Sequence, residues 1–170
     1  MRGVPDMIIE RQATGFRVRP ATVGDAARLA PVLRKDDLRE IRAATRETPL
    51  AVLKRGYTTS DPCYAIVQGD DALVAMFGVV PESGSQSGII WLLASDALAS
   101  NPHRFLRHSR TWIDILHRRY RVLWNHVDAR NEAHIDWLHW CGFHSQGIEQ
   151  AFGVEGRPFH RFVKVRESFA

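Results

Sequence analysis

Cysteine and long apolar runs are both scarce in this chain. Its 170 residues include only two cysteines, Cys63 and Cys141, which fit reduced thiols better than a disulfide framework. No apolar stretch approaches the roughly 20 residues that span a bilayer, and the N-terminus lacks the apolar core of a signal peptide. We therefore expect no membrane association and an intracellular product, or one packaged inside a particle.

The bulk composition is that of an ordinary globular protein. Hydrophobic residues make up 45% of the chain and charged residues 25%. A chain of this length forms one domain with a real core. We expect an N-terminal arm over residues 1–15, a single domain over 16–166 and a short tail over 167–170.

The positive charge is concentrated in one segment. The net charge is +4, and the basic residues cluster over residues 103–121, HRFLRHSRTWIDILHRRYR. A solvated helix face explains this pattern, and a phosphate-rich ligand or a polyanionic partner such as nucleic acid are the alternatives. Because no recognised nucleic-acid motif accompanies the charge, we do not expect specific nucleic-acid readout.

Hydrophobic periodicity and turn residues predict a mixed α/β (α+β) protein with the order β-α-α-β-β-β-α-β-α-β-β. Thr22 is expected to cap the first helix, with Asp25 in its first turn. This order gives a mixed, mostly antiparallel central sheet with helices on both faces. The predicted strands lie at 16–19, 63–67, 72–80, 89–94, 121–127, 147–152 and 159–165. The predicted helices run from the Thr22 cap through Leu33, over 38–44 with 49–53, from 102 onward, and over 131–141.

The most informative segment is 120–143, YRVLWNHVDARNEAHIDWLHWCGF. An apolar strand leads to Asn131 at a helix start, and the helix stops at Gly142, eleven residues later. This arrangement resembles the second half of the acyl-CoA-binding core of GCN5-related N-acetyltransferases (GNAT). The resemblance implies a GNAT-like acyl-CoA acyltransferase fold with acetyl-CoA as cofactor.

The same resemblance implies where acetyl-CoA would bind. The main chain of Leu92, Leu93 and Ala94 would grip the pantetheine arm and help to polarise the thioester. The helix start at Asn101, with His103 and Arg104, would take the phosphates. Asn131 would cap its helix and contact the CoA arm, and capping alone is the alternative.

Two carboxylates are candidates for the catalytic base. Asp96 and Asp128 each end a strand beside the expected cleft and would assist deprotonation of an amine, directly or through water. The alternative for each is a plain turn or cap residue.

Two parts of the family's machinery are altered here. The family's phosphate loop carries an Arg/Gln-x-x-Gly-x-Gly/Ala pattern, whereas residues 95–107, SDALASNPHRFLR, contain no glycine. Side chains hinder the close approach of backbone to phosphate. The family also tends to place a proton-donating tyrosine seven residues after the asparagine, where this chain has Leu138.

The histidines near Cys141 do not predict a zinc site. Thiolate and imidazole are good zinc ligands, but His134 and His139 are five residues apart and point to different helix faces. Several tryptophans are expected to be core or subunit-contact aromatics rather than a base-stacking platform. These are Trp112, Trp124, Trp137 and Trp140.

A more specific resemblance covers residues 91–143. Small GNAT-like proteins of the internal virion and morphogenesis machinery of T7-like short-tailed bacteriophages share a pattern with this segment and also lack the glycine-rich loop. The matching residues are Trp91, Ser95-Asp96, Tyr120, Leu123-Trp124-Asn125, Val127, Asn131, His134-Ile135, Leu138 and Gly142.

The resemblance leaves several functions open. One is an accessory virion or assembly protein in the host cytoplasm or the virion, with acyl-CoA chemistry lost, and with phage structural proteins or a second copy as partners. Another is an active acetyl-CoA-dependent N-acetyltransferase that acts on an amine by direct transfer. A ligand-sensing or other binding role is the third.

Overall fold

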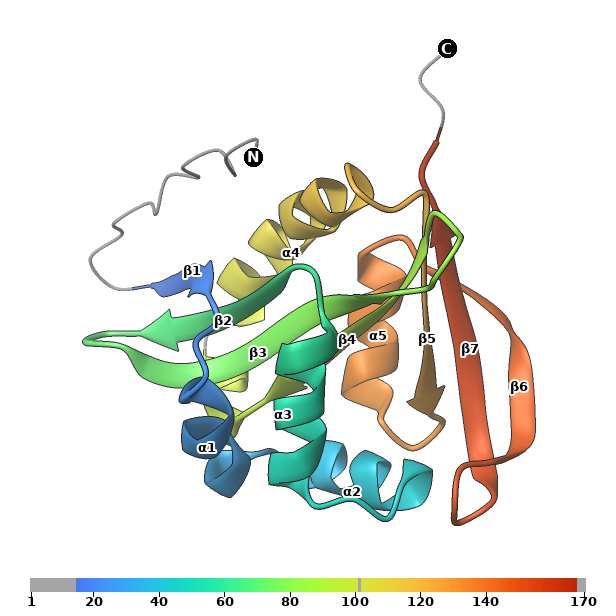
Figure 1. The fold of residues 1–170 in the computed structure, drawn as a ribbon, viewed down its shortest axis with the longest axis horizontal. Helices are drawn as coiled ribbons and strands as arrows, with labels where there is room; N and C mark the ends of the chain where they lie inside the picture. Colours follow the sequence, from blue (N-terminus) through green and yellow to red (C-terminus); the bar gives the residue numbers. More distant parts are fainter. Residues whose placement is uncertain (1–14, 101, 168–170) are drawn as a thin grey trace.

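The central feature of the fold is one seven-stranded sheet with the strand order β1-β2-β3-β4-β5-β7-β6 (Figure 1). The structure is a computed structural model, which describes residues 15–100 and 102–167. Only β4 and β5 pair in parallel, and the predicted mixed, mostly antiparallel sheet is confirmed. The strands are β1 (Phe16–Pro20), β2 (Cys63–Gln68), β3 (Ala72–Pro81), β4 (Ser87–Ala94), β5 (Val122–Asp128), β6 (His144–Phe152) and β7 (Arg157–Val165).

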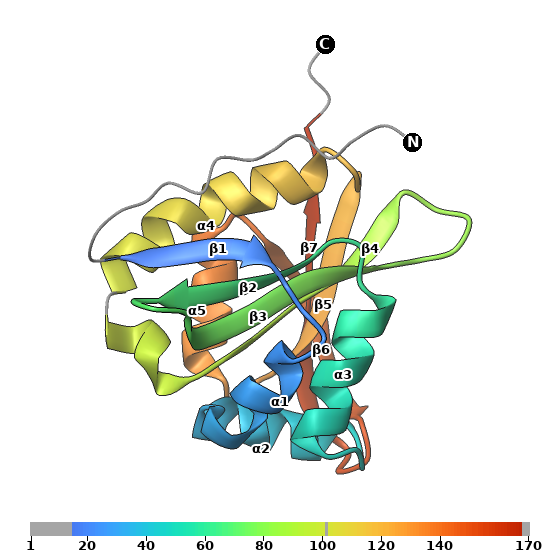
Figure 2. The same ribbon diagram turned by 60° about the vertical axis from the view of Figure 1, so that its left-hand side comes forward.

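Helices cover both faces of the sheet, as expected (Figure 2). On β4 the pleat separates the two cores, because Leu92 packs with α4 and α5 whereas Leu93 packs with α1, α2 and α3. None of the described helices has the length and apolar character of a membrane span. The α-helices are α1 (Asp25–Leu29), α2 (Lys35–Ala44), α3 (Pro49–Thr59), α4 (Pro102–His117) and α5 (Glu132–Trp140), and the 3₁₀ helices are η1 (Ala30–Val32) and η2 (Asp96–Ser100).

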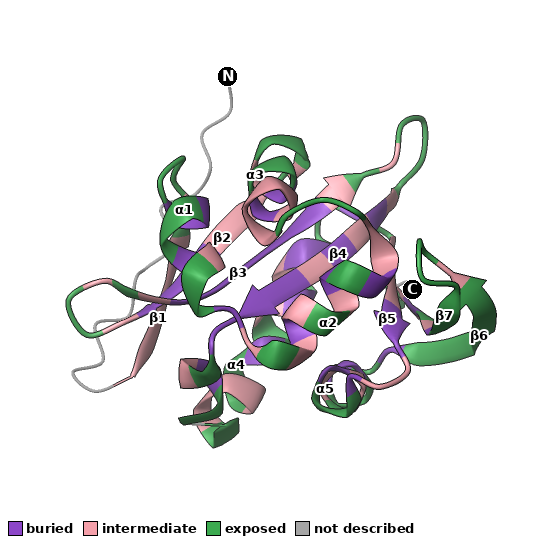
Figure 3. Cartoon of the chain, turned by 90° about the horizontal axis from the view of Figure 1, so that it is seen from below, coloured by how far each residue is buried: buried purple, intermediate pink, exposed green. Residues whose placement is uncertain are grey.

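The sheet splits between β4 and β5. Their pairing ends at Ile89 and Trp124, although β4 continues to Ala94 and β5 to Asp128. Figure 3 shows the two strand ends apart, with α2 beside the gap. Beyond Ile89, the edge of β4 that faces β5 therefore has no strand partner within residues 15–100 and 102–167.

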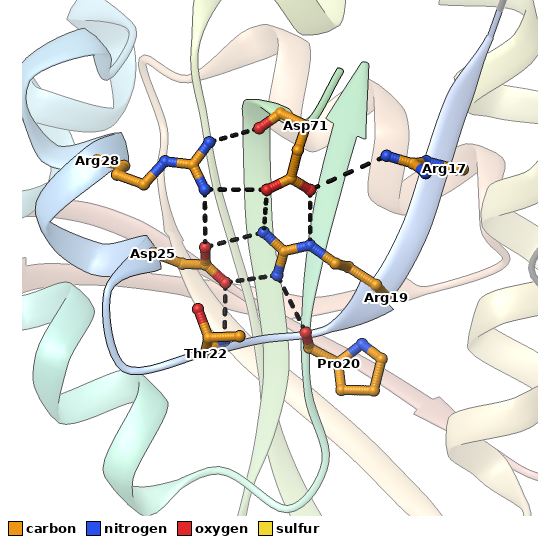
Figure 4. Close-up of polar contacts among 7 residues, drawn as sticks. All are labelled: Arg17, Arg19, Pro20, Thr22, Asp25, Arg28 and Asp71. Atoms are coloured by element: carbon orange, nitrogen blue, oxygen red, sulfur yellow. Dashed lines mark hydrogen bonds and ion pairs between the residues drawn. The ribbon is translucent and has the colours of Figure 1, made fainter. Parts of the chain in front are cut away.

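An ionic cluster joins β1, α1 and the turn between β2 and β3 (Figure 4). The guanidinium of Arg19 contacts both the buried Asp25, at 2.7 Å, and Asp71, at 2.9 Å. The predicted role of Thr22 as a helix cap is wrong, since Gly24 is the N-cap residue. Asp25 instead accepts the main-chain N–H of Thr22 at 2.7 Å, because its carboxylate is turned back toward β1 to meet Arg19.

Several boundaries differ from the sequence prediction. Helix α3 continues past Leu53 to Thr59. Gly56 lies within it, where the Trp91 ring occupies the space that a side chain would fill. Strand β6 begins at His144, three residues earlier than expected, since this exposed edge strand has no apolar alternation to mark it. The stop at Gly142 is confirmed, because this glycine has a φ of +86° just after α5. The proposed domain limits stay a prediction.

Candidate functional site at the gap between β4 and β5

The end of β4 is held by the N-terminal half of α2. The carboxylate of Asp37 accepts the Ala94 amide at 2.8 Å, and the Ala94 carbonyl accepts the Arg34 amide at 2.8 Å. The Arg34 guanidinium in turn donates to both Asp37 oxygens, at 2.7 and 3.1 Å. Both polar groups of the Ala94 main chain that face the gap are therefore already bonded.

The end of β5 is held by the same helix, one turn further along. Glu40 accepts hydrogen bonds from the Asn131 side chain at 3.0 Å and from the Asp128 amide at 3.2 Å. Burial raises the pKa of the Glu40 carboxyl to about 8, against the opposing effect of the Asn131 hydrogen bond. At neutral pH the Glu40 carboxyl is therefore mostly protonated.

A cavity of about 400 Å³ lies on the other side of the gap, between α4 and α5. Its walls are mostly apolar, and Trp137 stacks on Phe105 with ring centroids 5.8 Å apart. Its volume is within the range of small-molecule pockets. The lining residues are Arg34, Leu92, Leu98, Ala99, Pro102, Phe105, Leu106, Ala133, His134, Asp136, Trp137 and Trp140.

His134 is the buried titratable group of this cavity. Burial lowers its pKa to about 4, and its Nδ1 has no hydrogen-bond partner in the part of the chain that the structure describes. The imidazole is therefore neutral at physiological pH.

The structure separates the three predicted residues of β4. Leu92 lines the cavity, Leu93 points into the core on the opposite face, and the Ala94 amide is bonded to Asp37. Of the expected pantetheine edge, only the part near Leu92 borders open space.

The predicted phosphate ligands are not gathered at one point. Asn101 lies outside the described residues, and His103 is exposed near the start of α4 without lining the cavity. The Arg104 guanidinium packs against Gly15, in the space that a Cβ there would fill. Asn131 caps α5 by accepting the His134 amide at 3.4 Å, and its amide group donates to Glu40.

The two predicted bases occupy different surroundings. Asp96 is exposed at the start of η2. Asp128 is buried and accepts hydrogen bonds from the Arg130 side chain at 2.6, 2.9 and 3.2 Å, and these bonds lower the pKa of its carboxyl despite burial. The carboxylate oxygens of Asp128 are thus already hydrogen-bonded. The role of Asp96 or Asp128 as a catalytic base stays a prediction.

Three residues that hold the ends of β4 and β5 are not predicted by the sequence: Arg34, Asp37 and Glu40. A signal existed for one of them, because Asp37 lies four residues before Ile41, on the buried face of an amphipathic helix. A carboxylate on the buried face of a helix needs a hydrogen-bond donor or a cation beside it. Nothing local indicated that the partner would be the end of β4.

A metal centre is not formed by the described residues, which contain no group of three or more histidine, cysteine or carboxylate side chains placed to hold an ion. His134 lines the cavity, whereas His139 packs edge-on against Phe162 of β7. Burial raises the pKa of the Cys141 thiol to about 12.

The arrangement of strands and helices is that of known acetyltransferases. A ribosomal-protein-S5-alanine acetyltransferase from Vibrio fischeri superposes with a TM-score of 0.65 at 14% identity, over 91% of this chain and 95% of that one. A GNAT-family acetyltransferase from Bacillus anthracis gives a TM-score of 0.66 at 11% identity, over 88% and 94% of the two chains. This chain has the GNAT fold.

A third solved structure extends the comparison within the GNAT fold. A spermidine N-acetyltransferase chimera from Vibrio cholerae gives a TM-score of 0.65 at 13% identity, over 88% of this chain and 95% of that one. No protein-family profile matches the sequence, and no curated protein matches it. At these identities the likeness concerns the fold alone.

The residues present do not fit acetyl-CoA well. The main-chain donor at the end of β4 is taken by Asp37, residues 95–107 contain no glycine, and Arg104 is turned to Gly15. Among the described residues that line the cavity, most are apolar, and the one arginine, Arg34, is paired with Asp37.

Proposed function

We propose that this chain is a GNAT-fold protein that has lost acetyl transfer and serves as an accessory protein of a phage particle or of its assembly. The observation that carries the proposal is the bond from the Ala94 amide to the Asp37 carboxylate. Transfer on this fold needs a main-chain donor that meets the thioester oxygen as negative charge develops. A carboxylate at that amide occupies the donor and repels the charge.

Two further features support the loss of chemistry. The glycine-free segment after β4 forms η2 and the start of α4, so side chains stand where a phosphate needs bare backbone. Leu138, at the place of the expected proton donor, is fully buried in the core beneath α5. A hydrocarbon there neither donates a proton nor admits solvent.

The accessory role rests on the resemblance to phage proteins over residues 91–143. Several residues of that pattern serve packing in this chain. Trp91 donates its indole N–H to Ser60 at 2.8 Å, and Trp124 donates to Glu82 at 2.8 Å. Such bonds fix surface loops to the sheet, which a scaffold needs. Phage structural proteins or a second copy of the chain are its partners, in the host cytoplasm or the virion.

Calorimetry with the full chain tests the loss of chemistry. Titration with acetyl-CoA and with CoA at millimolar concentration should give neither heat nor a thermal shift. In the Asp37→Ala variant, measured at a temperature at which circular dichroism shows it folded, the freed Ala94 amide should give tighter acetyl-CoA binding than in the matched Asp36→Ala variant of the same helix. Strong binding by the wild-type protein, together with CoA release in the presence of amines, would refute the proposal.

Mass spectrometry of purified particles and assembly intermediates tests the accessory role. The chain should be present in at least one of them at a constant ratio to a structural protein. Absence from both would remove the accessory role while leaving the calorimetric result intact.

A second candidate function is favoured by Glu40. A carboxyl with a pKa of about 8 beside the end of β5 suits a general base for an ammonium acceptor. The active N-acetyltransferase then uses Glu40 rather than Asp96 or Asp128. A thiol-release assay with a panel of amines would detect it, and Glu40→Gln should lower the rate at least about 100-fold. No thiol release by the wild-type protein eliminates this candidate.

A further inference from the structure

We infer that the outer face of α4 binds a nucleic-acid strand through its phosphodiester backbone, without reading its sequence. Residues 102–121 contain six arginines and one acidic residue, so the segment carries a formal charge of +5. The whole chain carries +4. All of the net positive charge therefore lies on one helix and the turn after it, which is the electrostatic footprint of a polyanion site.

Four of these arginines are exposed and have no carboxylate partner among the described residues. They are Arg107, Arg110, Arg118 and Arg121. Arg119 is instead paired with Asp61 at 2.7 Å, and Arg104 is packed against Gly15. An exposed guanidinium that is not neutralised by a carboxylate keeps its full charge for an external phosphate.

The helix places these charges in a row. Arg107 lies in α4 and Arg118 directly follows its last residue. Their spacing of eleven residues is about three helical turns, which on a regular helix places two side chains on one side, about 16 Å apart. Arg121 extends the row beyond the end of the helix, and Asp114 is the one acidic residue on this face. The face lies on the outside of the sheet, away from α1, α2 and α3 (Figure 2).

An exposed aromatic ring lies beside the row. Trp140 is 43% exposed, and the Arg110 guanidinium lies 4.2 Å from the centre of its ring. Arg110 also donates to the Trp140 carbonyl at 2.9 Å, which fixes the pair. A basic row with an accessible aromatic ring is the arrangement that holds single-stranded nucleic acid, because every base can stack.

The same face argues against a lipid surface as the partner. Membrane-surface helices bury large apolar side chains in the interface. On α4 the exposed positions hold Pro102 and otherwise only histidine, arginine, threonine and aspartate side chains. Helix α4 itself therefore offers charge without an apolar anchor, and the exposed Trp140 beside it is a single ring.

Fluorescence anisotropy with a labelled single-stranded oligonucleotide of mixed sequence tests the inference on the full chain. Four phosphate contacts predict a slope of about −3 for log K against log salt concentration. The Arg107→Ala, Arg118→Ala double variant should bind at least tenfold more weakly at about 50 mM salt, with the slope reduced to about half.

The matched control removes two arginines elsewhere. Arg42 and Arg46 are exposed on the opposite side of the sheet, at and after the end of α2. The Arg42→Ala, Arg46→Ala variant has the same net charge as the α4 variant and should lose less than twofold in affinity. Circular dichroism of both variants should match that of the wild-type protein, because all four side chains are exposed.

Several results would overturn the inference. One is the absence of binding at low salt, and another is an equal loss in both double variants, which would indicate only a general charge effect. A preference above about tenfold between unrelated sequences would contradict backbone recognition. Binding to vesicles of anionic lipid without binding to the oligonucleotide would assign the face to a membrane surface instead.

Discussion

Asp37 on α2 accepts the main-chain N–H of Ala94 on β4 at 2.8 Å, and the two residues are 57 positions apart in the chain. In an unbroken sheet this amide would bond to the neighbouring strand. Here the sheet has split, and a carboxylate from a helix replaces the missing strand. Glu40 makes the equivalent bond to the Asp128 amide at the end of β5. One helix thus closes both edges of the gap.

Loss of the Asp37 carboxylate should destabilise the protein strongly. Asp37→Ala leaves the Arg34 guanidinium and the Ala94 amide without their partner. Breaking a buried pair in this way costs about 3 kcal/mol or more. Chemical denaturation should show this loss of unfolding free energy.

The neighbouring carboxylate is the control for this change. Asp36 is paired with Arg39 at 2.8 Å on the exposed side of the same helix. Asp36→Ala should cost less than about 1 kcal/mol. Equal losses in the two variants would contradict a special role for the bond between Asp37 and Ala94.

Glu40 should make stability fall as the pH rises. Its pKa in the folded state, about 8, lies above that of an unfolded glutamate, so the folded state binds the extra proton between those values. Its stabilising contribution is complete below about pH 4.5 and is lost as the pH rises through 8. Glu40→Gln removes this dependence. The unfolding free energy of the variant, relative to that of the wild-type protein, should therefore rise by up to about 1.4 kcal/mol per pH unit.

The useful window for this measurement is pH 6.5 to 8. Burial lowers the pKa of His134 to about 4, so its contribution is complete above about pH 6.5 and is lost as the pH falls through 4. Below pH 6.5 the two groups act in opposite directions. The unfolding free energies of the wild-type protein and of Glu40→Gln could instead differ by a constant amount from pH 6.5 to 8. That result would show that the pKa of Glu40 is not raised by burial.

The cluster around Arg19 should depend unequally on its two acids. Asp25 is fully buried, whereas the Asp71 side chain is 39% exposed. Asp25→Asn should lower the unfolding free energy by about 3 kcal/mol, because the Arg19 guanidinium loses its buried negative partner. Asp71→Asn should cost less than about 1 kcal/mol, since the site is solvated and asparagine tolerates its φ of +85°. Thermal and chemical unfolding should rank the two variants in this order.

Replacing Leu138 with tyrosine should harm the fold rather than create an enzyme. Leu138 is 0% exposed and belongs to the same buried core as Leu116, Leu123 and Phe162. The larger ring should cost about 1–3 kcal/mol by overpacking. Leu138→Met, a volume-conserving change, should cost less than about 1.5 kcal/mol. Thiol release that appears only in Leu138→Tyr would contradict this expectation.

Local patterns in the sequence predicted most of the elements. Apolar runs on either side of a turn marked β2 and β3, Pro49 marked the start of α3, and the distance from Asn131 to Gly142 marked both ends of α5. Each signal lies within one element and depends only on backbone preferences and side-chain periodicity. The weak signals failed where periodicity was absent, as in the exposed first residues of β6.

Most elements, the GNAT-like order and the absence of glycine after β4 could be read from the sequence. The bond between Asp37 and Ala94, the raised pKa of Glu40 and the packing of Arg104 against Gly15 arise only in the folded chain. These outcomes depend on contacts between segments far apart in the chain. A carboxyl's hydrogen bonds and pKa are set by what surrounds it in space, and no local pattern contains that information.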